Sequence, residues 1–317
     1  MEVFTIYILP FVLMMAAELI YFKIADRYNI IDKPNQRSSH AVPVTRGGGI
    51  IFLVAMVLFS FYSKGTYPYL LTAMLVSGIV SFADDVKPLP NYIKFSAHIA
   101  SVLLVLRECS VLSSLPLLYL LVIAIVLIGV INAYNFMDGI NGITGLYSLA
   151  VIAPLYFTET GENLKLLMLF SLLALLVFNF FNTRKKARCF AGDVGSISLA
   201  ILIAFLIIMR IRQTDDFLYI GLLMIYGLDA VYTIVQRLFQ HENIFQPHRK
   251  HLYQYLSNEK KIPQLVVGGT FAFIQAMISF SISYGYLKIQ GIAIVFISLS
   301  IAYWVLKAPF IRRNSVK

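Results

Sequence analysis

Long apolar segments separated by short polar ones follow one another along the whole chain. A helix needs about 20 mostly apolar residues to cross a bilayer core, with roughly 17 to 25 as the usual range. Apolar runs bounded by charge clusters, proline and glycine predict about eleven membrane-spanning helices. Their expected ranges are 3–25, 47–63, 67–83, 92–106, 114–133, 143–158, 165–182, 196–211, 217–238, 264–286 and 290–307. The pattern predicts an all-α polytopic membrane protein with one transmembrane domain over residues 1–317.

The distribution of lysines and arginines predicts the orientation of the chain in the membrane. With the N-terminus outside, the inner segments hold 20 of the 26 lysines and arginines. The positive-inside rule therefore predicts a periplasmic N-terminus and a cytoplasmic C-terminus. The net charge of +10 then mostly faces anionic lipid headgroups, so no nucleic-acid partner is needed to explain it.

The polar segments of the two sides differ in content. The outer ones are short and plain, whereas the inner ones hold all five histidines. The inner segments read DKPNQRSSHAVPVTRGGG (32–49), FADDVKPLPNYIKFSAH (82–98), NAYNFMDGINGITG (132–145), RKKARCFAGDVGS (184–196) and QHENIFQPHRKHLYQYL (240–256). Any chemistry is therefore expected at the cytoplasmic face.

Four carboxylates at the inner ends of predicted helices are candidates for that chemistry. Asp84 and Asp85 are adjacent at a lipid boundary, where like charges repel unless a cation compensates them. Asp138 and Asp193 are each flanked by glycine, which allows close approach of a ligand. Mg²⁺ is the expected metal, with Mn²⁺ as a substitute, because it is usually held by one or two carboxylates plus substrate phosphates. The alternatives are an N-cap for Asp193 and a solvated cap for the Asp84–Asp85 pair.

Basic and histidine side chains suit an anionic ligand. His248 and His251 are three residues apart and share a face if helical, and Arg249 is available for phosphate. Lys94 lies near the paired carboxylates and could hold a lipid phosphate. A second cluster precedes the glycine run and comprises Arg37, His40 and Arg46. For three further lysines, snorkelling to lipid headgroups is the favoured alternative: Lys250, Lys260 and Lys261.

Asparagines surround Asp138 at the mouth of the fifth apolar run. We expect Asn132, Asn135 and Asn141 to bind substrate there, since they can present polar groups near the water boundary. The alternative is that these amides cap a helix C-terminus before Gly139.

The ordered motifs DKPNQRSSH…PVTRGGG, ADD, NAYNFMDGINGITG, GDVGS and PHRKHLYQ resemble those of a known family. The chain is similar to the polyprenyl-phosphate N-acetylhexosamine-1-phosphate transferases of glycosyl transferase family 4, over residues 32 to about 256. The resemblance implies an enzyme of the bacterial inner membrane that moves a sugar 1-phosphate from a UDP-sugar to undecaprenyl phosphate and releases UMP. A homodimer stays open.

The same resemblance implies roles for the carboxylates. Asp84 and Asp85 match the paired catalytic-site carboxylates, Asp193 with Asp85 the Mg²⁺ site, and Lys94 a phosphate contact. Asp138 matches the first acid of a DGxDG motif near metal and nucleotide. Direct in-line attack is favoured, since a lipid monophosphate is largely dianionic at neutral pH and needs little general-base help. A covalent aspartyl-phosphate route stays open.

Other positions match a histidine loop or depart from the family pattern. His248, Arg249 and His251 match the loop that contacts the donor diphosphate or sugar. Asn141 replaces the second acid of DGxDG, and we expect it to bind the nucleotide. The sequence HRKHLYQ differs from the triple histidine of the muramoyl-pentapeptide enzymes and favours the O-antigen and capsule-initiating subgroup, with GlcNAc, QuiNAc or FucNAc as the sugar.

Two other functions compete with this one. A transporter or lipid flippase would place ionisable groups deep in the membrane, and Glu18 and Asp229 are the deepest in the sequence. Asp229 follows Gly227, a pair that we interpret as a break in the ninth helix. A glycosyltransferase using the same donors would release UDP instead of UMP.

Overall fold

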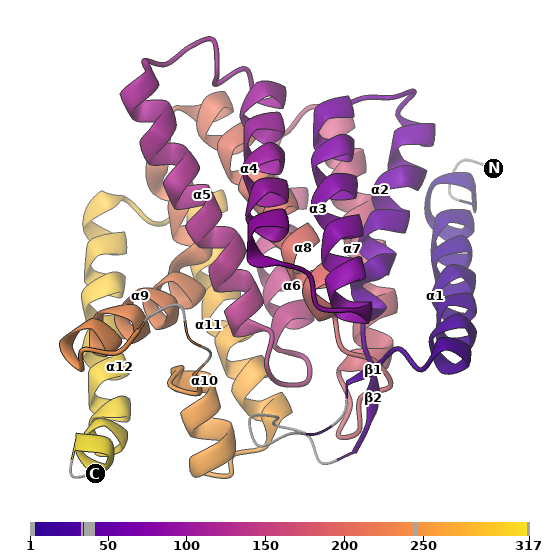
Figure 1. Cartoon of the computed structure of the whole chain (residues 1–317). Coiled ribbons are helices and arrows are strands. Elements are labelled where there is room, and N and C mark those ends of the chain that lie inside the picture. Colours follow the sequence, from indigo (N-terminus) through magenta and orange to yellow (C-terminus); the bar gives the residue numbers. More distant parts are fainter. Residues whose placement is uncertain (1–3, 33, 35–41, 244–245, 247, 316–317) are drawn as a thin grey trace.

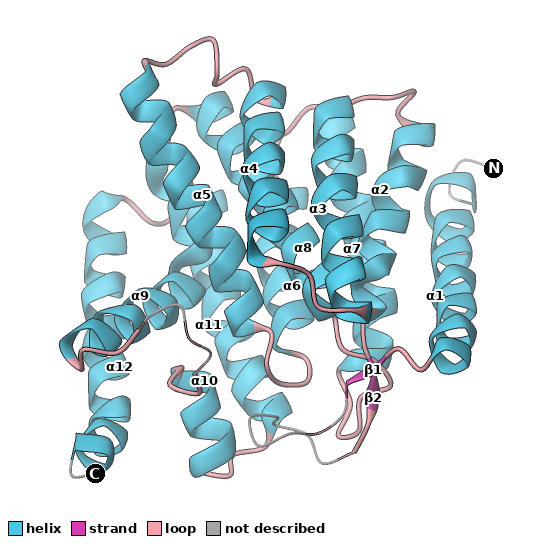
Figure 2. Ribbon diagram, viewed as in Figure 1, coloured by secondary structure: helices cyan, strands magenta, loops and turns pink. Residues whose placement is uncertain are grey.

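The computed structural model describes residues 4–32, 34, 42–243, 246 and 248–315, with side chains described as far as Pro309. Figures 1 and 2 show a bundle of helices with one small two-stranded sheet at one end. The sheet pairs β1 (Ile31–Asp32) with β2 (Val44–Thr45) in antiparallel register, Ile31 opposite Thr45. The helix α1 begins and α12 ends at opposite ends of the bundle.

The long helices, in chain order, are α1 (Leu9–Tyr28), α2 (Ile51–Tyr62), α3 (Pro68–Val86), α4 (Asn91–Glu108), α5 (Leu117–Met137), α6 (Ile143–Tyr156), α7 (Glu162–Asn182), α8 (Gly192–Thr214), α9 (Met224–Phe239), α11 (Gln264–Ser283) and α12 (Ile289–Ser315). The short ones are the π-helices η1 (Phe4–Ile8) and η4 (Tyr255–Glu259), the 3₁₀ helices η2 (Gly48–Ile50) and η3 (Phe217–Leu223), and the single turn α10 (Leu252–Gln254).

Proline marks several helix starts, as the sequence pattern predicts. Pro68 is the first residue of α3, and Pro90, Pro116 and Pro263 directly precede α4, α5 and α11. Proline fits there because the first-turn N–H groups have no partner within the helix in any case.

Within the described residues, eight helical segments are long and apolar enough to cross a membrane. They are Phe4–Tyr28, Pro68–Val86, Leu117–Met137, Glu162–Asn182, Gly192–Thr214, Phe217–Phe239, Gln264–Ser283 and Ile289–Pro309. The segments Gly48–Tyr62 and Ile143–Tyr156 are apolar but shorter, and α4 is not among the eight. Each predicted range overlaps one long helix, in three cases together with a short one, which is consistent with an all-α multi-pass membrane protein. The count of eleven crossings and the direction of the termini stay predictions.

Burial separates an inner helix from peripheral ones. In α8, 83% of the apolar span is buried inside the protein, against 6% in α12. The α8 helix packs against α2, α3, α5 and α6. Large apolar side chains of α5 such as Leu117, Leu121 and Ile125 are exposed, as expected where lipid covers a helix.

The ninth apolar segment is broken, but one turn earlier than the Gly227–Asp229 pair suggests. The 3₁₀ helix η3 ends at Leu223 and α9 begins at Met224, and Figure 1 shows α9 strongly tilted against its neighbours. Buried Gln275 of α11 satisfies the interrupted backbone: it accepts the Ile225 N–H at 3.1 Å and donates to the Gly221 carbonyl at 3.1 Å. The break is therefore fixed by a side chain from another helix.

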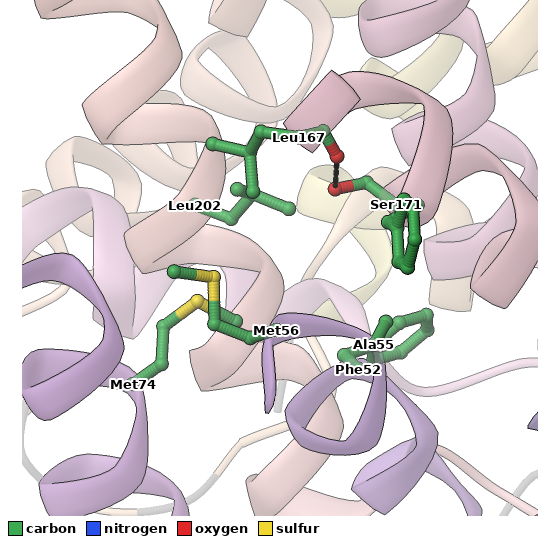
Figure 3. A pocket seen from close by; sticks show the side chains of 8 residues that line it. Phe52, Ala55, Met56, Met74, Leu167, Ser171 and Leu202 are labelled. Atoms are coloured by element: carbon green, nitrogen blue, oxygen red, sulfur yellow. Dashed lines mark hydrogen bonds between the residues drawn. The ribbon is translucent and has the colours of Figure 1, made fainter. Parts of the chain in front are cut away.

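A small cavity lies between α2, α3, α7 and α8 (Figure 3). Its lining is apolar except for Ser171, whose hydroxyl donates to the Leu167 carbonyl at 2.7 Å. About three helical turns of α3 separate its residue Met74 from Asp85. The cavity therefore has no free polar group for a charged ligand and is remote from the predicted site.

Candidate active site

The start of α8 is capped by a carboxylate from α3. Asp85 Oδ1 accepts the Asp193 N–H at 3.2 Å, and Oδ2 accepts the Val194 N–H at 3.3 Å. These amides have no acceptor within α8, and a negative charge at a helix N-terminus is favourable. The Asp85 side chain is fully buried, so this contact fixes the end of α3 against the start of α8.

Arg46 joins the two carboxylates. Its Nε lies 2.8 Å from Asp85 Oδ1, and its Nη2 lies 3.6 Å from Asp193 Oδ1. Burial alone would lower the pKa of the Arg46 guanidinium, but the negative charge of Asp85 and Asp193 outweighs it and raises that pKa. Arg46 therefore remains a cation between two acids.

Glycines allow the Arg46 segment to reach α8. The Gly48 N–H donates to the Phe190 carbonyl at 2.8 Å, and the Gly49 N–H to the Ala191 carbonyl at 3.0 Å. A Cβ on Gly49 would lie 2.1 Å from the Gly195 Cα, which no side chain could accommodate. This backbone-to-backbone crossing places Arg46 beside Asp193, as small residues do between membrane helices.

Asp84 has a separate set of partners. Its Oδ2 lies 3.0 Å from Lys94 Nζ, and its Oδ1 accepts the Leu89 N–H at 2.7 Å. The Lys94 side chain is 31% exposed, so its ammonium stays within reach of an anion from solvent or from the headgroup region. The adjacent carboxylates thus face different cations, which reduces their mutual repulsion.

Asp138 follows the last residue of α5 and has little compensation. Within the described chain, its carboxyl group accepts one hydrogen bond, from the Thr144 hydroxyl 2.6 Å from Oδ1. Burial raises the pKa of the Asp138 carboxyl to about 7, the Thr144 hydrogen bond opposes this, and the nearby Asp193 adds to the rise. Among the described residues, Asp138 has no ion pair, and the more distant Arg46 only partly offsets the rise in its pKa.

The three asparagines differ in their surroundings. The Asn135 side chain is hydrogen-bonded to Asp193 and accepts a hydrogen bond from the Ser196 hydroxyl at 3.2 Å. It therefore lies within the acidic cluster, which comprises Asp84, Asp85, Asp138 and Asp193. Asn132 donates to the Ile128 carbonyl of its own helix at 2.9 Å. Asn141 is buried and donates to the Arg184 carbonyl at 2.9 Å. The Asn141 contact joins the loop after α5 to the loop after α7. Binding of the nucleotide by Asn141 stays a prediction.

The histidine segment, residues 248–253, lies against the end of α5. The rings of His248 and His251 lie 6.2 and 6.3 Å from that of Phe136, and 4.9 Å from each other. The Tyr253 hydroxyl donates to the Phe136 carbonyl at 2.8 Å. Because Phe136 is next to Asn135 and two residues from Asp138, the structure brings the histidines and the acidic cluster to the same helix end.

The two histidines have different environments. Burial and the charges of His251 and Arg237 lower the pKa of His248 to about 3, so it is neutral. Its Nδ1 accepts the Lys250 N–H at 3.4 Å, which leaves the proton on Nε2. His251 is 2% exposed, and its Nδ1 lies 3.4 Å from Asp229 Oδ1.

Other predicted cations are placed as follows. The Lys250 ammonium contacts Glu242 and donates to Gln240 Oε1 at 2.7 Å, so it is an internal partner and does not snorkel freely. Arg249 is partly buried beside His248. Arg37 and His40 lie outside the described residues, so their predicted substrate contacts stay predictions.

A magnesium ion at this site stays a prediction. In the described part of the chain, no group of three or more His, Cys, Asp or Glu is arranged to hold a metal by itself. Mg²⁺ needs only one or two carboxylates when substrate phosphates supply the rest. Burial and the charge of Asp193 both raise the pKa of the Asp138 carboxyl, so a cation beside these two acids would be favourable. Of the predicted ligands, Asp193 is 20% exposed, whereas Asp85 Oδ1 already faces both Arg46 and a backbone N–H.

Several side chains that organise this site carry no clear sequence signal. Thr144 lies six residues from Asp138, a separation without helical meaning across a turn. The Gly49–Gly195 contact joins positions 146 residues apart. Asp229, interpreted above as the mark of a helix break, instead supports His251 and the start of α10. The sequence signal for a role of Asp229 is that it is an acidic residue inside an apolar run.

Comparison with known proteins gives one positive result. No curated protein matches the chain. A family model does match, over just under half of the chain. Its range includes Lys94 and the four predicted site carboxylates, Asp84, Asp85, Asp138 and Asp193, but neither Arg46 nor the histidine segment. Residues 67–211 match the family described as glycosyl transferase family 4, and this match supports assignment of the chain, as a transferase, at the level of that family.

Proposed function

We propose that the protein transfers N-acetylhexosamine 1-phosphate from a UDP-sugar to undecaprenyl phosphate and releases UMP, at the cytoplasmic face of a bacterial inner membrane. The observation that carries the proposal is the gathering of Asp84, Asp85, Asp138 and Asp193 at one end of a membrane helix bundle, with Arg46 and Lys94 among them. The match to glycosyl transferase family 4 also supports a polyprenyl-phosphate sugar-phosphate transferase in general.

The cations in this proposal bring two anions together. Arg46 and Lys94 screen the repulsion between the acceptor phosphate and the donor diphosphate. Asp193, with Asp85 and the neighbouring Asp138, would hold Mg²⁺, and Mn²⁺ could replace it. When bound, the metal neutralises charge on the donor diphosphate and on the departing UMP.

The transfer itself is a direct displacement. An oxygen of the acceptor phosphate forms a bond to the β-phosphorus of the donor, and the bond from that phosphorus to the UMP oxygen breaks. The contacts of Asp85 support this route over an aspartyl-phosphate, because bonds from the α8 amides and from Arg46 make its carboxylate a weaker nucleophile. At a chiral β-phosphorus, direct displacement inverts configuration, and retention would contradict it.

The remaining residues are assigned to the donor. Neutral His248 and buried His251 contact the donor diphosphate or sugar with Arg249, and Asn132, Asn135 and Asn141 contact the nucleotide side. Arg37 and His40 are assigned to substrate by their motif alone. We further propose that the reaction is the first membrane step of an O-antigen or capsule polysaccharide, with GlcNAc, QuiNAc or FucNAc as the sugar, and that the enzyme can form a homodimer.

The transporter alternative receives no support from the described residues. Glu18 is enclosed and faces Cys189 Sγ at 3.7 Å, and Asp229 is enclosed by donors from three helices. Neither carboxylate lines a described cavity.

Product analysis tests the proposal. Purified protein is incubated with undecaprenyl phosphate, Mg²⁺ and a panel of UDP-amino sugars, and the released nucleotide is identified. We expect UMP and a lipid-linked sugar diphosphate. Release of UDP would indicate a glycosyltransferase of another type, and absence of both nucleotides with every donor would refute the proposal.

A further inference from the structure

The peripheral helix α12 contains a buried lysine. Only 6% of its apolar span is buried, and Figure 1 shows it at the edge of the bundle beside α9. Lys307 is nevertheless 0% exposed and Tyr303 is 4% exposed. Removing an ammonium group from water is costly unless it is paired, so the surroundings of Lys307 must compensate it.

Two hydroxyl groups link Lys307 to Asp229. Lys307 Nζ donates to Thr233 Oγ1 at 2.9 Å and to the Tyr303 hydroxyl. The Thr233 and Tyr303 hydroxyls then donate to Asp229 Oδ1, at 3.2 and 3.3 Å. A single ammonium thus supports a buried carboxylate through two hydrogen-bonded bridges.

That carboxylate fixes the histidine segment. Asp229 Oδ1 accepts the Leu252 N–H at 2.8 Å, and Oδ2 accepts the Tyr253 N–H at 3.4 Å. The same Oδ1 lies 3.4 Å from His251 Nδ1. In addition, Tyr253 contacts the Phe136 carbonyl. The conformation of residues 251–253 therefore depends on where Asp229 is held.

We propose that Lys307, Thr233 and Tyr303 are positioning residues that act through Asp229 to hold the histidine segment in its donor-binding conformation. The kinetic part of this inference rests on the proposed function, whereas the physical link between α12 and residues 251–253 does not. None of the three side chains needs to touch substrate.

A second contact between the same helices provides a control. The Tyr232 hydroxyl donates to Ser300 Oγ at 2.7 Å, and the Tyr232 and Trp304 rings are 5.5 Å apart. This contact also docks α12 on α9, but it has no bond to Asp229. A variant at Ser300 therefore weakens docking without altering the Lys307–Asp229 link.

The experiment compares Lys307→Met and Thr233→Val with Ser300→Ala and Thr233→Ser, all as full-length protein in nanodiscs. Hydrogen–deuterium exchange is measured for peptides covering residues 251–255. Because Asp229, the acceptor of the Leu252 and Tyr253 amides, is then held less firmly, we expect about tenfold faster exchange in the first two variants. Thr233→Ser keeps the hydroxyl and Ser300→Ala keeps the link, so both should match the wild type.

Steady-state kinetics form the second arm. Lys307→Met and Thr233→Val should raise the KM of the UDP-sugar by about tenfold and leave the KM of undecaprenyl phosphate within about twofold. Unchanged exchange in Lys307→Met, or equal effects in Ser300→Ala, would overturn the link. Faster exchange with an unchanged donor KM would overturn the positioning role. If no UDP-sugar is turned over, the proposed function fails, and the exchange arm still decides the link.

Discussion

Two buried carboxylates, Asp138 and Asp229, are built in opposite ways. Asp229 is surrounded by two backbone N–H groups, two hydroxyls, a histidine and, one bond further away, an ammonium. Asp138 has a single described hydroxyl partner and another acid nearby. A carboxylate whose donors come from the protein serves the fold, whereas one left short of positive charge is available to a ligand. The difference supports our proposal that Asp229 stabilises the fold and that the region of Asp138 and Asp193 carries the chemistry.

The largest expected effect is in the acidic region. Asp193→Asn should reduce the rate of transfer by roughly 100- to 1,000-fold, since it removes a charge that holds the metal-bound donor. Expression and membrane insertion should not change. Asp26→Asn is the control, because Asp26 is an exposed acid, with its side chain 54% exposed, that pairs with Arg188 at 2.6 Å. Initial rates of UMP release measure both, and near wild-type turnover in Asp193→Asn would show that the metal assignment is mistaken.

The second largest effect is a loss of stability when the negative charge of Asp229 is removed. Asp229→Asn leaves the buried Lys307 without its counter-charge, and breaking such a pair costs about 3 to 5 kcal/mol. We expect a clear fall in the unfolding temperature of the purified protein. Asp138→Asn at pH 8 should instead leave it unchanged or higher. If both substitutions destabilise equally, the contrast between the two carboxylates is wrong.

A smaller loss of stability is expected where the segment after Arg46 crosses the start of α8. Gly49→Ala forces a methyl group against the Gly195 backbone, and such overpacking costs about 1 to 3 kcal/mol. Gly129→Ala in α5 is the matched control, since a Cβ there meets nothing within 4 Å. Thermal unfolding of the two variants measures the difference, and tolerance of Gly49→Ala would argue against a tight crossing.

The pH dependence of stability tests Asp138 directly. Its pKa is raised to about 7 in the folded protein from the ordinary value of 3.8. Between these two values the folded state holds a proton that the unfolded state has released, so stability falls as pH rises and levels off above about 7. Metal-free wild type should therefore lose more stability between pH 5 and 8 than Asp138→Asn. Parallel unfolding temperatures across this range would show that Asp138 already has a compensating charge.

The smallest effect is expected at the rim of the histidine region. Glu242 contacts Arg237 and Lys250, which lower its pKa against the opposing effect of burial, and its side chain is 34% exposed. Because Glu242→Gln keeps an acceptor for both cations and Arg237 also donates to the Asn243 carbonyl, this substitution should lower the unfolding temperature much less than Asp229→Asn does. A loss comparable to that of Asp229→Asn would make Glu242 part of the support.

The sequence predicts the helices well and the contacts between them poorly. Apolar runs and proline locate each long helix, because crossing a bilayer demands a length that is visible locally. The motifs also identify which helix ends carry acids. However, the capping of Asp193 by Asp85 joins residues 108 positions apart, and no local pattern encodes that choice of partner. The position of Lys307 is a similar case: the charge count treats it as one of many inner cations, and only packing reveals it as the buried partner of Thr233 and Tyr303.

Consecutive residues at the end of α5 serve the two regions. Asn135 bonds Asp193 and Ser196, while the Phe136 carbonyl accepts the Tyr253 hydroxyl. Successive residues of an α-helix point about 100° apart. The rotation of α5 about its own axis therefore sets the contacts of both the acidic cluster and the histidine segment. Inserting a single residue earlier in α5 would turn Asn135 and Phe136 away from their partners at the same time.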